Sequence, residues 1–128
     1  MDVEYRVKSD KNFQEACDSV KDAVSENGFS ILAEIKTGDI LTSKGFEYPQ
    51  MNTYEVCNPS YAHALLKQDQ RFESMLPCKI VVKSKDEGTE IIALLPEPIA
   101  GLLGSQSLQA VIKDAQRLLK KIVDDIAL

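Results

Sequence analysis

Tryptophan is absent from this chain, and phenylalanine and tyrosine supply only 6% of its residues. The hydrophobic core is therefore expected to be mostly aliphatic. No apolar run approaches the roughly 18 residues that a membrane-spanning helix needs, and the first residues show neither the basic nor the apolar region of a signal peptide. These absences predict a cytoplasmic protein that does not bind membranes.

Histidine and cysteine are also scarce, with one histidine, His63, and three cysteines. An odd number of cysteines in a reducing compartment argues against a disulfide framework. The chain contains no Walker loop, no GxGxxG motif, no Ser-His-Asp arrangement and no paired-carboxylate motif. The sequence therefore predicts no catalytic residue and no cofactor, and it does not indicate an enzyme.

Basic residues are outnumbered by acidic ones, fifteen against twenty, which gives a net charge of -5 and a pI near 4.9. The basic cluster of Arg117, Lys120 and Lys121 is interspersed with aspartates, as on a solvated helix face. A nucleic-acid partner is therefore not expected. With 128 residues, 44% of them apolar, the chain has the size and composition of one globular domain over residues 1–128.

Alternating apolar and polar residues predict four strands, at residues 3–7, 29–35, 50–57 and 78–83, and a hairpin turn at residues 86–88 predicts a fifth at residues 90–95. Asn12 and Glu15 have capping-box spacing and predict the start of a first helix, which ends at Asn27 and Gly28. A shorter helix is predicted to begin at Asn58 and to carry Ala62, Leu65 and Leu66 toward the core.

The last helix is predicted to run from Ser105 or Ser107 to about Ile126, with one continuous apolar face. The order of elements predicts a two-layer α+β domain. Its sheet is mostly antiparallel and is covered on one face by the first and last helices. A short helical element or loop between Gly38 and Gly45 connects the second and third strands.

The fifth predicted strand is apolar on both of its faces. Ile92 and Leu94 lie on one face, and Ile91, Ala93 and Leu95 on the other. Because a sheet with one solvated face does not readily accommodate this pattern, something is expected to cover the second face. The segment 99–104 that follows is too short for a stable helix, and it is expected to pack against another part of the protein.

The segment from Tyr54 to Pro59, followed by Ala62, Leu65, Leu66 and Asp69 and then by residues 76–80, resembles the prokaryotic family known as domain of unknown function 302. The resemblance implies a β-α-β4-α fold of the TATA-binding-protein-like group and a homodimer, with no established activity. Its structural markers are Asn58, Pro59, Leu76 and Pro77. It implies no catalytic residues.

Cys57 and Cys78 are the strongest candidates for chemistry. If the third and fourth strands are antiparallel neighbours, both thiols lie at the same edge of the sheet, and His63 follows on the next helix. Three interpretations stay open: buried thiols that only pack, a redox-active pair, or a metal or soft-ligand site that uses all three residues. A structural zinc site normally has tighter ligand spacing, so packing is the leading interpretation.

The leading functional hypothesis is a homodimeric module that binds a small apolar ligand. Its dimer interface is predicted from five apolar residues: Ile92, Leu94, Ile99, Leu102 and Leu103. The alternative is a thiol-based redox or soft-metal-binding protein that uses Cys57 and Cys78.

Overall fold

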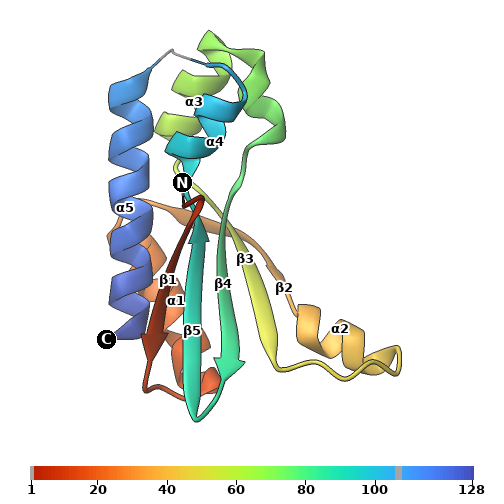
Figure 1. The fold of residues 1–128 in the computed structure, drawn as a ribbon. Coiled ribbons are helices and arrows are strands. Elements are labelled where there is room, and N and C mark those ends of the chain that lie inside the picture. The colour runs from red at the N-terminus through yellow and green to blue at the C-terminus, as the bar shows by residue number, and fades with distance from the viewer. Residues whose placement is uncertain (1, 106–107) are drawn as a thin grey trace.

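The computed structural model describes residues 2–105 and 108–128 (Figure 1). Along the chain the elements are β1 (Glu4–Ser9), α1 (Phe13–Glu26), β2 (Ser30–Ile35), α2 (Thr37–Ser43), β3 (Met51–Cys57), α3 (Pro59–Gln68), the 3-10 helix η1 (Gln70–Ser74), β4 (Cys78–Lys85), β5 (Gly88–Leu94), α4 (Pro96–Leu102) and α5 (Gln109–Ala127). None of the described helices combines the length and apolar composition that a membrane span requires.

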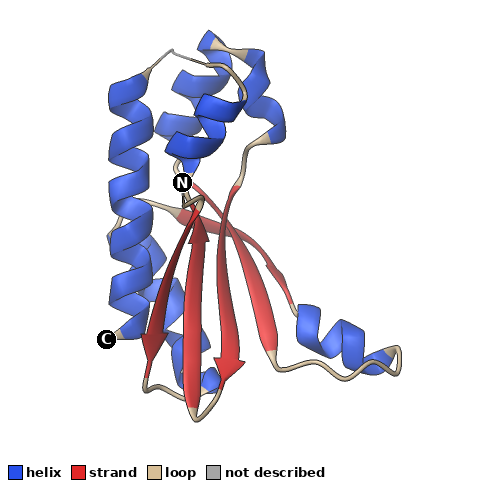
Figure 2. Cartoon of the chain, viewed as in Figure 1, coloured by secondary structure: helices blue, strands red, loops and turns tan. Residues whose placement is uncertain are grey.

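The five strands form one antiparallel sheet in the order β1-β5-β4-β3-β2 (Figure 2). Helices α1 and α5 pack on one face of this sheet. Their apolar stripes meet alternate strand residues, including Tyr54, Val56, Ile80, Val82 and Ile91, in one largely aliphatic core. The predicted two-layer α+β fold with helices on one face is therefore confirmed.

The predicted start of the first helix is also confirmed. The Asn12 side chain accepts a hydrogen bond from the Glu15 backbone N–H at 2.9 Å, and the Glu15 carboxylate accepts one from the Asn12 N–H. This reciprocal pair satisfies two backbone donors that a helix start otherwise leaves without partners. Helix α1 thus begins where the sequence indicated.

The prediction that residues 99–104 are too short to form a stable helix is wrong, whereas their predicted packing against another part of the protein is observed. The segment after β5 forms helix α4, which begins at Pro96. A proline is tolerated in the first turn because its missing N–H would have no helical partner there. Packing against α5 stabilises this short helix, and the Glu97 backbone N–H donates to Gln116 Oε1 at 3.0 Å. Helix α5 begins at Gln109, so the predicted start at Ser105 is not observed; the other predicted start, Ser107, lies outside the described residues.

Strand β2 is less buried than its alternating sequence predicted. It is an edge strand, and its register shifts between Ile31 and Ala33, so that Leu32 lies in an irregular position. Ile31, Leu32 and Ile35 are all exposed. A bulge on an edge strand interrupts the regular row of unpaired backbone groups, which hinders pairing with another strand.

No described helix covers the second face of the sheet, where strand five was expected to need a partner. Glu90 is buried on this face and accepts hydrogen bonds from Arg6 at 2.8 Å and from Lys85 at 3.4 Å. Lys79 donates to Glu55 at 2.9 Å. Long charged side chains cover apolar surface with their aliphatic stems, so Ile92 is only 8% exposed without a second layer.

A second hydrophobic cluster lies at one end of the sheet. Helices α3, η1 and α4 gather there beside the N-terminal half of α5 (Figure 1). Its buried members are Leu65, Phe72, Ala100 and Ile112. Leu66, predicted to face the core, is instead 38% exposed, because it lies one helical step away from the buried face that carries Leu65. Helix α2 projects from the opposite end of the sheet, beyond β2.

Candidate functional site

The candidate site begins where β3 ends and β4 starts. Asn58 caps α3 by accepting a hydrogen bond from the Tyr61 N–H at 3.2 Å, and Pro59 opens the helix. Val56 pairs with Cys78 across the two antiparallel strands, and Cys57 is the next residue along β3. The expected placement of both thiols at one end of the sheet is therefore observed.

Both cysteines line a small cavity between the sheet, α3 and α5. Its volume is about 20 Å³, and Phe29, Tyr61 and Met75 also form its wall. A cavity of this size is close to the minimum that holds one water molecule, but a water needs two or more polar partners. The lining is almost wholly apolar, which favours an apolar occupant.

A wider groove of about 150 Å³ lies immediately outside this cavity, between β4, β5 and α4. The two spaces share Met75, Pro77, Cys78 and Pro96 in their walls. Met75 is half-buried, and its unbranched side chain can adopt several shapes at little cost. A thin and adaptable wall therefore separates the inner cavity from the surface.

Tyr61 closes the cavity on the side of α5. Its ring packs edge-on against Phe29, with ring centres 6.5 Å apart. Its hydroxyl donates to the Asp114 carboxylate on α5, and this hydrogen bond raises the pKa of Tyr61 and lowers that of Asp114. This hydrogen bond links α3 to α5 beside the cavity.

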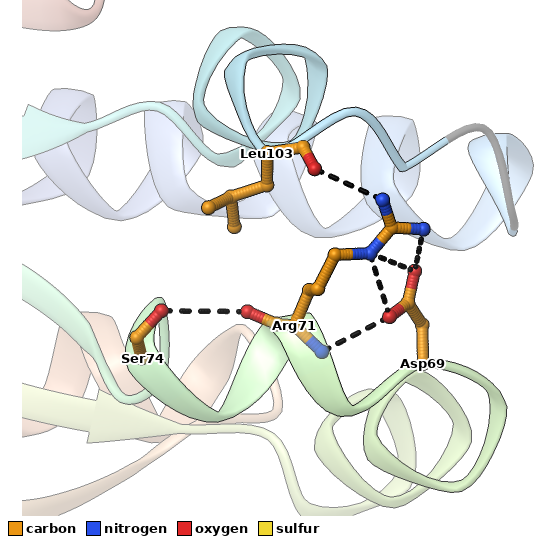
Figure 3. Close-up of polar contacts among 4 residues, drawn as sticks. All are labelled: Asp69, Arg71, Ser74 and Leu103. Atoms are coloured by element: carbon orange, nitrogen blue, oxygen red, sulfur yellow. Dashed lines mark hydrogen bonds and ion pairs between the residues drawn. The ribbon is translucent and has the colours of Figure 1, made fainter.

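Arg71, on η1, links two of the elements near the site (Figure 3). Its guanidinium donates to both carboxylate oxygens of Asp69, at distances from 2.8 to 3.1 Å, and Nη1 donates to the Leu103 carbonyl at 3.1 Å. The Asp69 side chain also caps η1 by accepting from the Arg71 N–H. Arg71 thus ties η1, which precedes Met75, to the end of α4.

The model of the family described as Domain of unknown function DUF302 matches residues 5–126. This chain belongs to the DUF302 family. A solved structure described as the crystal structure of the uncharacterized conserved protein DUF302 from Bacillus stearothermophilus superimposes with a TM-score of 0.92 at 24% sequence identity, covering 98% of this chain and 99% of that one. A comparison with curated proteins gave no match.

In this DUF302 chain, the environment of Cys78 does not favour thiolate chemistry. Burial first, and then the negative charge of Cys57, raise the pKa of the Cys78 thiol to about 11. The nucleophilic form of cysteine is the thiolate. At neutral pH Cys78 is therefore a protonated, weakly reactive thiol, and all three cysteines are free.

His63 does not join the two cysteines. It is exposed on α3 and is absent from the wall of the cavity that Cys57 and Cys78 share. Among residues 2–105 and 108–128, no group of three or more His, Cys, Asp or Glu side chains could hold a metal ion. The three residues of the soft-metal hypothesis are thus not assembled around one point.

The residues predicted for a dimer interface are unequally accessible in the DUF302 fold. Ile92 is buried, and Ile99 and Leu103 are half-buried. Leu94 is 37% exposed and Leu102 75% exposed. Leu94 and Ile99 both line the outer groove, so this part of the predicted interface adjoins the cavity entrance.

Sequence reasoning missed several residues of the cavity wall in this DUF302 chain, including Phe29, Tyr61, Ile112 and Ala115. They come from segments far apart in the sequence. Ala115 offered the one available signal, because it is a small residue within a stripe of large apolar residues on α5. A small residue at such a position leaves space beneath the helix.

Proposed function

We propose that this protein is a small-molecule binding module whose apolar ligand occupies the cavity and the adjoining groove. The observation that carries the proposal is the wall that the two spaces share. Rotation of the Met75 side chain would join them into one site, with no change in the backbone. Apolar protein cavities of about 150 Å³ bind molecules of the size of benzene.

The lining suits a flat or short-chain apolar compound. Met75 contributes a polarisable sulfur, which makes favourable contacts with aromatic rings, while Phe29 and Tyr61 offer ring surfaces. The Asn58 side chain is the main polar group in the cavity wall, and its carbonyl oxygen is already bound to the Tyr61 N–H. Such a site selects by shape and apolar packing rather than by charge.

Indole titrated into the ¹⁵N-labelled protein tests this function, with NMR amide shifts as the readout. We expect saturable shifts around Met75, Cys78 and Ile112. Met75→Ala removes the dividing side chain, so that more of the indole ring can be buried, and burial of one methylene-sized group stabilises a complex by about 0.8 kcal/mol. The Kd for indole is therefore expected to fall several-fold in this variant.

Two further variants complete the test. Ala115→Leu fills the cavity and should abolish the saturable shifts. Leu66→Ala removes an exposed side chain of α3 and should leave the Kd unchanged. Shifts scattered over the surface, or a Kd that Ala115→Leu does not alter, would show that indole does not enter the cavity, and the proposed function would then fail.

A homodimer is the second part of the proposal, and the exposure of Leu94 and Leu102 favours it. Leu94 and Ile99 line the outer groove, and Leu102 follows Ile99 by about one turn of α4. A second copy seated there would cover this apolar rim. Sedimentation equilibrium at micromolar concentration should then give twice the 14.2 kDa mass of the chain.

A further inference from the structure

The first and last helices are linked at the C-terminal end of α1. Asn27 is 7% exposed there, and its side-chain Nδ2 donates to the Ala23 carbonyl at 2.7 Å and to the Asp125 carboxylate on α5 at 3.0 Å. Neither Asn27 nor Asp125 belongs to the wall of the apolar cavity. We infer that Asn27 is a site of spontaneous deamidation, and that this modification breaks the link between α1 and α5.

The residue after Asn27 makes its amide chemically labile. Of the four asparagines in the chain, Asn27 alone is followed directly by a glycine. Because glycine has no side chain to shield its backbone nitrogen, this nitrogen can reach the Cγ atom of the preceding asparagine. The fold requires glycine at position 28, since its φ of 79° lies in the left-handed region that commonly ends a helix. The structure therefore places a reactive pair of residues where α1 ends.

Deamidation at this pair consumes one water molecule and needs no other reactant. The Gly28 nitrogen forms a bond to Asn27 Cγ, while the bond from Cγ to Nδ2 breaks. Nδ2 takes up the proton that the Gly28 nitrogen loses, and it leaves as ammonia. Water then opens the resulting succinimide ring at either carbonyl. The product is an aspartate, or an isoaspartate in which the main chain runs through Cγ, and no group is oxidised or reduced.

The folded chain protects both reacting groups. The Gly28 N–H donates to the Ser25 carbonyl at 3.1 Å, so the attacking nitrogen is already engaged. The Asn27 amide is buried and is held by its two hydrogen bonds, one of them to α5. Attack by the Gly28 nitrogen therefore requires this end of α1 to open first, and such local openings are much rarer than the closed state.

An ionised carboxylate at position 27 cannot replace the amide. It has no N–H to donate, so the Ala23 carbonyl would lose this donor, and it would place a second negative charge against Asp125. Lys121 pairs with Asp125 at 3.0 Å, which balances one carboxylate and not two. Carboxylates that share one partly buried site repel each other. Each modified chain therefore loses the contact between α1 and α5.

Incubation of the full chain at mildly alkaline pH, followed by peptide mapping with mass spectrometry, tests the site. The mass increase that accompanies the change from amide to carboxyl should accumulate at Asn27, with isoaspartate among the products, and not at Asn12, Asn52 or Asn58. The reaction should be faster in the urea-unfolded chain. No modification at Asn27, equal modification of the other three asparagines, or equal rates in the folded and unfolded chains would each overturn the inference.

Variants measure the loss of the link through urea unfolding. Asn27→Asp reproduces the charge of the product and should raise the equilibrium constant of unfolding by about tenfold or more, as expected when a buried acceptor loses its donor. Asn12→Asp makes the same change at the other end of α1 and should have little effect, because aspartate caps a helix start as well as asparagine does.

A double variant separates the repulsion from a general loss of folding. Adding Asp125→Asn to Asn27→Asp removes one of the two carboxylates and should restore most of the stability. Equal effects of Asn27→Asp and Asn12→Asp, or no recovery in the double variant, would overturn the proposed effect on the link between α1 and α5. The peptide mapping of the wild-type chain does not depend on whether Asn27→Asp folds.

Discussion

At the scale of single residues, Cys78 shows how a buried position alters chemistry. Its thiol belongs to the wall of an apolar cavity, where the charged thiolate is poorly solvated. The pKa of about 11 means roughly a hundredfold less thiolate at neutral pH than an ordinary cysteine has. The sequence pattern alone, a cysteine at a strand start, could not reveal this.

Iodoacetamide labelling of each cysteine, followed by mass spectrometry, measures this effect. Cys78 should react about a hundredfold more slowly at neutral pH in the folded chain than in the urea-unfolded chain, and its rate should rise up to about pH 11. Because folding raises the pKa of Cys78, the protonated thiol adds to the free energy of unfolding. This contribution is complete below the pKa that Cys78 has in the unfolded chain, and it is lost as the pH rises toward 11. Equal rates in the folded and unfolded chains would contradict this environment and revive the redox alternative.

At the scale of the elements, local signals in the sequence predicted those parts of the structure that depend on nearby residues. The capping box at Asn12 and the Asn58-Pro59 helix start are set by groups within a few positions, and both are observed. Helix α4 and the exposure of β2 depend on distant partners. The Gln116 side chain on α5 accepts a hydrogen bond from the Glu97 backbone N–H of α4, and the position of β2 at the sheet edge follows from the strand order. Neither the α4 helix nor the exposure of β2 could therefore be inferred from the periodicity of the sequence.

The link that Arg71 forms between η1 and α4 makes a prediction about pH. Its hydrogen bonds lower the pKa of Asp69 to about 2. Because the pKa of Asp69 is lower in the folded chain, its carboxylate stabilises the folded state. This stabilisation is complete above the pKa of about 3.9 that an aspartate has in an unfolded chain, and it is lost as the pH falls through about 2. The difference in unfolding free energy between wild type and Asp69→Asn should therefore be largest above pH 4 and vanish near pH 2.

Urea unfolding over this pH range provides the measurement. Arg71→Leu should lower the unfolding free energy at neutral pH and remove most of the effect of Asp69→Asn, since the two groups act as one unit. Lys121→Leu, which removes an exposed ion pair within α5, serves as the control and should change little. If Asp69→Asn lowers the unfolding free energy equally at all these pH values, the charge of the Asp69 carboxylate does not stabilise η1.

At the scale of the whole molecule, the open sheet face explains the sequence of β5. Ile92, Val81, Thr53 and Ile35 lie opposite one another across four strands. Charged residues surround this apolar row: Arg6 lies opposite Ile92 and pairs with Glu90, and Lys79 pairs with Glu55. Side chains of the same chain therefore cover the second apolar face of β5, and no partner is needed to bury it. Burying those charges in an interface would cost desolvation free energy, which limits the proposed dimer contact to the end near α4.

The dimer contact at that end can be tested with two leucines of nearly equal exposure. Leu94 is 37% exposed at the outer groove, and Leu66 is 38% exposed on α3. Leu94→Asp places a charge in the proposed contact and should shift sedimentation from dimer to monomer, because an unpaired buried charge costs several kcal/mol. Leu66→Asp adds the same charge elsewhere and should leave the mass unchanged. A monomeric wild type, or dissociation by both variants alike, would exclude this contact while leaving indole binding at the cavity as a separate question.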